Sequence, residues 1–168
     1  MGRRARRGAA LSVPPIRFER DDLTRAAVSA LVELHLRAAF ENSPPGSVFA
    51  LDLTGLRDPA VTLWTAWEGE SLLGMGALKR LDGAQAELKS MRTASAHLRR
   101  GVGWAMLAHL IAEARRQGYR RLWLETGANQ AFAPARAMYA RAGFVPCAPF
   151  AGYTDTAFSR YFTLDLTS

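Results

Sequence analysis

Apolar residues recur at helical spacing in three stretches of the chain, and each stretch predicts an amphipathic helix with one buried face. Asp21-Asp22 stands before the first stretch as a candidate cap, and Gly118 follows the second where a left-handed helix end is expected. Pro134 fits the first turn of the third. The predicted buried faces are Leu23, Ala26, Ala27, Ala30, Leu31, Leu34 and Ala38; Val102, Met106, Leu107, Leu110, Ile111 and Ala114; and Ala135, Met138, Tyr139 and Ala142.

Short runs of alternating or continuously apolar residues predict strands between these helices. The turns Glu68-Gly69-Glu70 and Asp82-Gly83 join three of the runs into an antiparallel meander. A short helix or irregular segment is expected near residues 48–56. The predicted strands are residues 16–20, 61–67, 72–81, 85–93, 120–126, 144–147 and 158–166.

The order of these elements predicts an α/β fold, with a mixed sheet and helices packed on its faces. The chain has 168 residues, which suits one domain, and we assign that domain to residues 14–168. Residues 1–13 are basic, lack an apolar face and are expected to form a disordered tail.

The junction between the strand at 85–93 and the helix at 102–117 has the features of an anion-binding site. Gly101 and Gly103 allow the backbone to approach a ligand closely, and Arg99 and Arg100 add positive charge. The free N–H groups and the dipole of the helix N-terminus favour a phosphate. A dinucleotide fingerprint would need a third small residue where Met106 stands, and the Gly-Lys-Ser/Thr of a Walker loop is missing.

Charge and cysteine content restrict the other functional classes. The net charge is +7, but the tail supplies four arginines and leaves +3 for the rest, which argues against nucleic acid as a partner. The single Cys147 excludes an internal disulfide and favours a reducing cytoplasm. No apolar run approaches the roughly 20 residues of a membrane span, and no metal-ligand pattern or secretory leader is recognisable.

The sequence resembles the GNAT superfamily of N-acetyltransferases, and within it a bacterial branch. The loop at residues 98–103 matches the family pattern at Gly101 and Gly103, with Leu98 in place of the usual polar residue. Residues 87–93 and 121–126 resemble the fourth and fifth strands of the family, and residues 135–144 resemble its closing helix with Tyr139 and Gly143-Phe144. The resemblance implies a mostly antiparallel sheet of six to seven strands, a splayed pair of strands 4 and 5, and about four flanking helices.

The same resemblance implies acetyl-CoA as co-substrate, without a metal. The pyrophosphate would lie on the loop, the pantetheine arm would pair with residues 91–93, and a backbone N–H near Met91 would face the thioester oxygen. The implied cofactor-binding residues are Met91, Arg92, Thr93, Leu98, Arg99, Arg100, Gly101, Val102, Gly103 and Trp104.

Transfer of acetyl to a primary amine needs a base for the amine and an acid for the leaving thiolate. Tyr139 is the family-matched acid, although a core tyrosine would show the same spacing. Glu87 and Glu125 are alternative bases, and each has a competing structural role in a salt bridge, for instance with Lys89 or Arg121. Glu87 and Lys89 share a strand face and could pair. His109 is expected on the exposed side of its helix, where it would be solvated.

The sequence defines the acceptor only as an amine, carried by a small molecule or a peptide. The resemblance implies that its pocket is built from residues 40–58 and 148–157. A non-catalytic acyl-CoA sensor is the alternative function, and a homodimer remains an open alternative to a monomer. Candidate acceptor contacts are Asp52, Asp58 and Asp155 for an ammonium group, and Phe49, Phe150 and Tyr153 for an apolar group.

Overall fold

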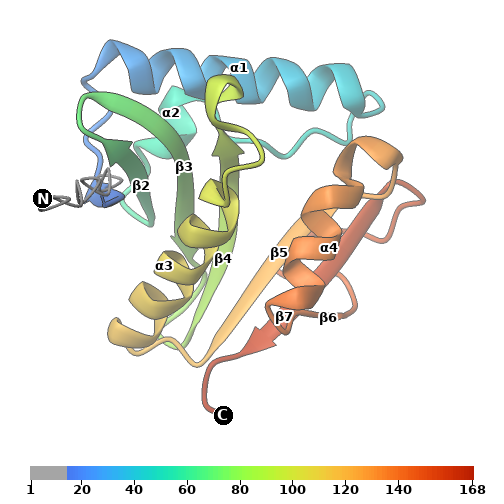
Figure 1. Cartoon of the computed structure of the whole chain (residues 1–168). Helices are drawn as coiled ribbons and strands as arrows, with labels where there is room; N and C mark the ends of the chain where they lie inside the picture. Colours follow the sequence, from blue (N-terminus) through green and yellow to red (C-terminus); the bar gives the residue numbers. More distant parts are fainter. Residues whose placement is uncertain (1–14) are drawn as a thin grey trace, which may run out of the picture.

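A single seven-stranded sheet forms the centre of the molecule (Figure 1). The computed structural model describes residues 15–168, and the predicted tail at 1–13 lies outside them. The strands are β1 (Arg17–Arg20), β2 (Val61–Glu68), β3 (Ser71–Arg80), β4 (Gln85–Thr93), β5 (Arg121–Gly127), β6 (Val145–Pro146) and β7 (Ser159–Asp165). The helices are α1 (Ala26–Asn42), α2 (Leu53–Leu56), α3 (Val102–Arg116) and α4 (Ala133–Arg141), with the 3-10 turns η1 (Ser95–His97) and η2 (Gln130–Phe132).

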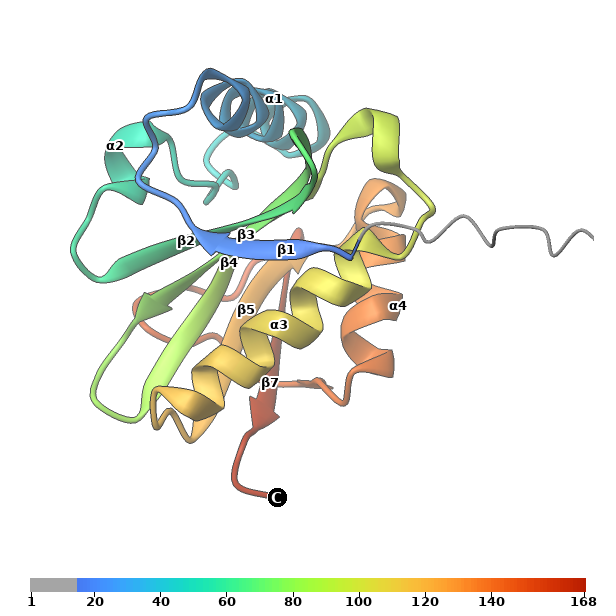
Figure 2. The same cartoon turned by 60° about the vertical axis from the view of Figure 1, so that its left-hand side comes forward.

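The strand order is β1-β2-β3-β4-β5-β7-β6, and within the described residues only the β4–β5 pair is parallel. Helices α1 and α2 cover one face of the sheet, and α3 and α4 cover the other (Figure 2). The predicted fold class, the mixed seven-stranded sheet and the four flanking helices are therefore confirmed. The predicted strand at 144–147 is shorter than expected, because only Val145 and Pro146 pair with β7.

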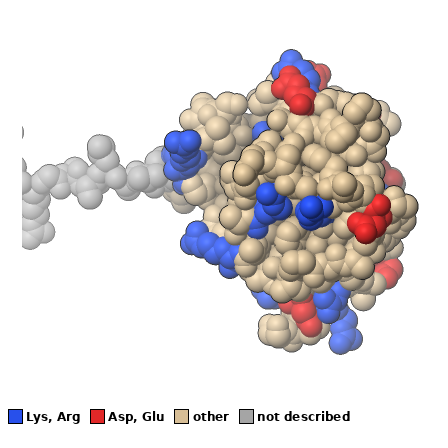
Figure 3. Space-filling model, turned by 90° about the vertical axis from the view of Figure 1, so that its right-hand side faces the viewer, with Lys and Arg blue, Asp and Glu red and all other residues tan. Residues whose placement is uncertain are grey.

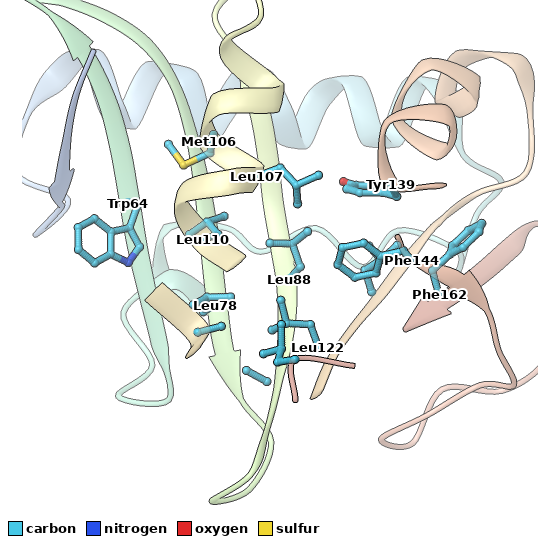
Figure 4. Packing of buried hydrophobic residues seen from close by; sticks show 14 of the residues in the cluster. Trp64, Leu78, Leu88, Met106, Leu107, Leu110, Leu122, Tyr139, Phe144 and Phe162 are labelled. Atoms are coloured by element: carbon cyan, nitrogen blue, oxygen red, sulfur yellow. The ribbon is translucent and has the colours of Figure 1, made fainter. Parts of the chain in front are cut away.

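Helix α3 packs directly on the sheet through its predicted apolar face (Figure 4). Its Val102, Met106, Leu107, Leu110 and Ala114 are buried. Gly76 of β3 makes this close packing possible, since a Cβ atom there would lie 2.6 Å from Leu110 Cδ1 and 2.7 Å from Met91 Sδ. The sheet therefore fixes the position of α3, and with it the loop that precedes the helix.

Strands β4 and β5 are paired for only three residues and then separate. Their register joins Gln85–Glu87 to Arg121–Trp123, and no later pair connects them in the described chain. Figure 1 shows β5 diverging from β4 toward the carboxyl ends of both strands. On its other side β4 contains a bulge: Ala77 pairs with Lys89 and Met75 with Arg92, so two residues of β4 lie opposite one residue of β3.

The start of α1 differs from the sequence prediction. Asp21 and Asp22 accept hydrogen bonds from backbone N–H groups two residues further on, at 2.8 and 3.1 Å, and do not cap the helix. The helix begins at Ala26, and Arg25 at the N-cap forms no side-chain cap. Local turns therefore use both carboxylates before the helix starts.

The predicted buried face of α1 is also partly wrong. Ala26, Ala27 and Ala30 are exposed, whereas Val28, Leu31 and Val32 are buried. The larger branched side chains bury more apolar area, so the helix turns them toward the sheet instead of the alanines.

His109 was expected to be solvated, and this prediction is wrong. Its ring stacks on Phe18 of β1 at a centroid distance of 4.4 Å and meets Trp64 of β2 edge-on at 4.5 Å. Burial lowers the pKa of His109. The supposed outer side of α3 is covered because β1 lies beneath it at the sheet edge.

The surface of the described residues carries scattered charges. On the face seen in Figure 3, separate basic and acidic groups lie among uncharged atoms, without a continuous basic band over its described part. No helix within residues 15–168 has the length and apolar character needed to cross a bilayer.

Candidate active site

A cavity of about 260 Å³ lies where β4 and β5 separate. Its walls come from α1, the segment after α1, the second half of β4, the end of β5, and α4 with the turn before it. The three predicted catalytic residues, Tyr139, Glu87 and Glu125, all line it, as do Met91 and Arg92. The fold thus brings together residues that are up to 52 positions apart in the sequence.

The N-terminus of α3 is formed by a loop in left-handed backbone conformation. Gly101 is the N-cap with φ 79°, it provides no side-chain cap, and the first turn contains no acidic residue. The N–H groups of Val102, Gly103 and Trp104 thus lack a side-chain partner from the cap, which is the arrangement of an anion site. A Cβ on Gly103 would lie 3.5 Å from Met138 Sδ and 3.6 Å from Thr93 Oγ1, so this residue faces the space between α4 and the end of β4.

The side chains of this loop are arranged differently from the sequence expectation. Arg100 donates from Nη2 to Glu68 Oε2 at 3.1 Å, and its Nη1 lies 2.7 Å from His97 Nδ1, so it is tied to β2 and η1. Leu98 is 58% exposed, and Arg99 is exposed with φ 62°. At this loop the uncapped backbone N–H groups, more than these side chains, are therefore the groups available to an anion.

Trp104 lies on the outer side of the same turn. The guanidinium of Arg141, on α4, sits 4.3 Å from the centre of its ring. This cation–π contact connects α3 to α4 beside the loop.

Tyr139 reaches the cavity from α4. Its ring packs against Phe144, and the residue is only 7% exposed. Figure 4 shows the hydroxyl pointing from α4 toward Leu107 of α3. Burial, and to a smaller extent the charge of Glu125, raises the pKa of this phenol, which therefore stays protonated at neutral pH.

Glu87 is 3% exposed and forms a compact polar cluster. Lys89 Nζ lies 3.2 Å from Glu87 Oε1, and the hydroxyl of Tyr153 donates to the same oxygen at 2.5 Å. Lys89 also donates to the Tyr153 hydroxyl at 3.0 Å. The predicted alternative for Glu87, an ion pair with Lys89, is confirmed, and Tyr153 joins it from the loop before β7.

Glu125 lies across the gap on β5. Ser159 Oγ donates to Glu125 Oε2 at 2.8 Å, while burial raises the pKa of the carboxyl group despite this bond and the nearby Lys89. Side chains alternate along β5: Leu122 and Leu124 belong to the hydrophobic core, and Glu125 faces the other way.

Sequence reasoning missed the contact between Arg92 and His35. Arg92 Nε donates to His35 Nδ1 at 3.1 Å, from β4 to α1. Burial first, and then the charges of Arg92 and Lys89, lower the pKa of His35 to about 4, so this imidazole is neutral and accepts the bond. The prediction gave Arg92 only a backbone role, and no sequence spacing pairs it with a residue 57 positions away.

The three aspartates proposed for the acceptor ammonium do not line the cavity. Asp52 Oδ1 caps α2 by accepting from Gly55 N at 2.7 Å, and Asp58 Oδ1 accepts from Ala60 N at 2.8 Å. Asp155 is exposed. This prediction is wrong because turn and cap bonds hold the first two carboxylates away from the site. Phe49 does line the cavity.

Comparison with known proteins agrees with this geometry. The model of the Acetyltransferase (GNAT) family matches residues 28–144. The chain is 49% identical to the uncharacterized N-acetyltransferase YsnE of Bacillus subtilis (strain 168) over 87% of this chain and 97% of that protein. It is 48% identical to the uncharacterized N-acetyltransferase YedL of Escherichia coli (strain K12), over 87% of this chain and 92% of that protein.

A solved structure has the same fold. The GNAT family acetyltransferase from Elizabethkingia anophelis, with acetyl-CoA bound, matches with a TM-score of 0.67 at 16% identity, over 89% of this chain and 97% of that one. The sequence resemblance to a bacterial branch of the family is confirmed by YsnE and YedL. The chain therefore belongs to the Acetyltransferase (GNAT) family and is an acetyltransferase.

Proposed function

We propose that the protein transfers the acetyl group of acetyl-CoA to a primary amine by direct attack within a ternary complex. The observation that carries this proposal is the cavity between the splayed strands, which both Tyr139 from α4 and Glu125 from β5 line. The N-terminus of α3, which has no side-chain cap, lies against Met138 of α4 and Thr93 of β4. The acetyl-CoA bound to the related fold from Elizabethkingia anophelis supports the choice of co-substrate. The single cysteine, Cys147, suits action in a reducing cytoplasm.

The first turn of α3 would hold the pyrophosphate of acetyl-CoA through the N–H groups of Gly101, Val102, Gly103 and Trp104. The separated edge of β4 at Met91–Thr93 offers backbone groups that β5 does not use, and these would pair with the pantetheine arm. Loop residues Leu98, Arg99 and Arg100 would contribute mainly by fixing the backbone, since Arg100 is held by Glu68.

The acceptor must lose a proton, because an alkylamine titrates near 10.4. We assign the base to Glu125, directly or through water. The burial that raises its pKa makes it a better proton acceptor than an ordinary carboxylate, and Ser159 holds it in place. Glu87 remains the rival, but one of its oxygens is already held by both Lys89 and Tyr153.

The leaving thiolate of CoA must gain a proton, and we assign this role to Tyr139. Its hydroxyl has no hydrogen-bond partner among the described residues and its phenol stays protonated at neutral pH, so the proton is available. A buried phenylalanine would fill the same space, so only the hydroxyl distinguishes the chemical role from the packing role.

Two measurements test the proposed function. Saturating acetyl-CoA should raise the melting temperature, because a ligand at about 100 times its Kd stabilises the folded state by roughly 2.7 kcal/mol. A panel of primary amines should then cause release of free thiol from acetyl-CoA. A thermal shift without thiol release for any amine would favour the acyl-CoA sensor instead. The absence of a shift at millimolar acetyl-CoA would refute both the acetyltransferase and the sensor.

A further inference from the structure

The cavity contains one positive charge without a negative partner. Its titratable lining residues are His35, Glu87, Lys89, Arg92, Glu125 and Tyr139. Lys89 and Glu87 neutralise each other at 3.2 Å, and His35 is neutral because its pKa is about 4. Arg92 forms no salt bridge with any carboxylate of residues 15–168. Glu125, the remaining acid, accepts a hydrogen bond from Ser159 and forms no salt bridge with Arg92.

The guanidinium of Arg92 is held in place but not saturated. Its Nε donates to His35 Nδ1, while neither Nη atom has a hydrogen-bond partner among the described residues. Arg92 is half-buried, so desolvation lowers its pKa, and an anion that entered would meet a partly desolvated cation. A guanidinium presents paired N–H donors that match the two oxygens of a carboxylate.

This cation is separate from the predicted phosphate site. Met91 packs against the α3 side of the sheet, whereas Arg92 bonds His35 of α1 on the opposite side. In the proposed function the uncapped N–H groups of α3 would hold the pyrophosphate. An anion at Arg92 therefore belongs to the second substrate, which would enter from the α1 side.

We infer that the acceptor is a free amino acid with an apolar side chain, whose carboxylate is bound by Arg92 with His35 as the positioning residue. This inference rests on the proposed function, since it names the acceptor of that reaction. The amine of such a molecule would reach toward Glu125 and the acetyl group. The apolar side chain would lie against Phe49 of the segment after α1, with Phe132 and Phe158 as further apolar walls.

The test compares acceptors that differ only in the carboxylate. Rates of thiol release are measured with leucine and leucinamide, and with phenylalanine and phenylalaninamide, for the wild type, Arg92→Gln, Arg92→Lys, His35→Phe and Arg37→Gln. Arg37 lies on the exposed side of α1, so its variant loses the same charge outside the cavity. For each variant, kcat/KM for the amino acid is divided by kcat/KM for its amide, and this acid-to-amide ratio is compared with the wild-type ratio for the same pair. Because every variant receives the same two acceptors, their different amine pKa values affect all ratios equally.

Arg92→Gln should lower the acid-to-amide ratio by about 10- to 100-fold, which is the effect expected from losing charge-assisted hydrogen bonds to the carboxylate. Arg92→Lys should recover part of the ratio, His35→Phe should lower it less, and Arg37→Gln should leave it unchanged. Melting temperatures without ligand verify that each variant is folded, and the shift with acetyl-CoA should persist in all of them.

Several results would overturn the inference. An equal loss for acids and amides would show that Arg92 does not bind the carboxylate, and loss of the acetyl-CoA shift in Arg92→Gln would assign the cation to the cofactor. A wild-type preference for the amides that persists after kcat/KM is corrected for the fraction of unprotonated amine would refute the acceptor class but leave acetyl transfer intact. Failure of the wild type to acetylate any amine would refute the proposed function itself, and this inference with it.

Discussion

Replacing Gly103 by alanine should change stability and cofactor affinity in opposite directions. Gly103 lies in the first turn of α3 with helical backbone, and an added Cβ would meet its nearest neighbours at 3.5 Å and 3.6 Å, which is ordinary van der Waals contact. The free protein therefore has room for the methyl group. The same methyl group would project into the space between the helix and Thr93, where we expect the phosphates and the pantetheine arm to pass.

The size of both effects can be estimated. Glycine to alanine at an unstrained position stabilises a protein by about 0.4–1 kcal/mol through the unfolded chain. For a domain of this size that raises the melting temperature by roughly 1–4 °C. If the methyl group weakens acetyl-CoA tenfold, about 1.4 kcal/mol, then a concentration of 100 wild-type Kd stabilises the variant by only about 1.4 kcal/mol, roughly half of the wild-type gain.

The assay is thermal unfolding of wild type, Gly103→Ala and Gly101→Ala, each without ligand and at one fixed acetyl-CoA concentration. Gly101 is the comparison position, because it has open space around it but φ 79°, so alanine there should cost about 1–2 kcal/mol without ligand. The two variants should thus shift the free protein in opposite directions.

Either of two outcomes would refute this reasoning. If Gly103→Ala lowered the melting temperature of the free protein, the first turn would not have the unstrained geometry described here. If it stabilised the free protein and kept the full acetyl-CoA shift, the cofactor would not approach the helix at this residue.

Three further predictions concern the cavity. Tyr139→Phe should lower turnover by about 10²- to 10⁴-fold with the Kd of acetyl-CoA unchanged, as measured by single-turnover kinetics and calorimetry; unchanged turnover would exclude Tyr139 as the acid. At pH values above the folded-state pKa of Glu125, Glu125→Gln should have a higher melting temperature than the wild type, because a raised folded pKa means that the ionised carboxylate costs stability. This difference should disappear as the pH falls toward 4, and a difference that stays constant across pH would contradict the prediction. For His35 the folded pKa of about 4 lies below the usual histidine pKa of 6.5, so the wild type should lose on the order of 3 kcal/mol of stability between pH 6.5 and 4. His35→Phe should lack this loss in denaturant titrations, and an equal pH dependence in both proteins would refute the reasoning.

The parts of the fold that sequence predicted best are those in which one strong periodic pattern decides the outcome. The stripe from Val102 to Ala114 placed α3 on the sheet, and the turn at Asp82-Gly83 placed the β3–β4 hairpin. Gly101 was expected to form a ligand-binding turn, and it has the left-handed backbone that only glycine adopts easily. The buried face of α1 was harder to predict, because alanine, valine and leucine occur on several sides of the helix. Periodicity alone therefore did not show which apolar face is buried.

The contacts of the predicted site residues could not be predicted from the sequence. Glu87, Glu125 and Tyr139 line one cavity, but hydrogen-bond partners of the two glutamates come from far along the chain. Tyr153 reaches Glu87 across 66 positions and Ser159 reaches Glu125 across 34. Side-chain pairs of this kind depend on tertiary packing, which leaves no local pattern in a single sequence.

The short pairing of β4 with β5 also divides the sheet into two halves. Three residue pairs, from Gln85–Arg121 to Glu87–Trp123, are the only ladder joining the two halves of the sheet within the described residues. Beyond this ladder the two half-sheets are joined through side chains, since Leu88 of β4 and Leu122 and Leu124 of β5 belong to the same hydrophobic cluster. The relative position of the two halves therefore depends on core packing more than on backbone hydrogen bonds.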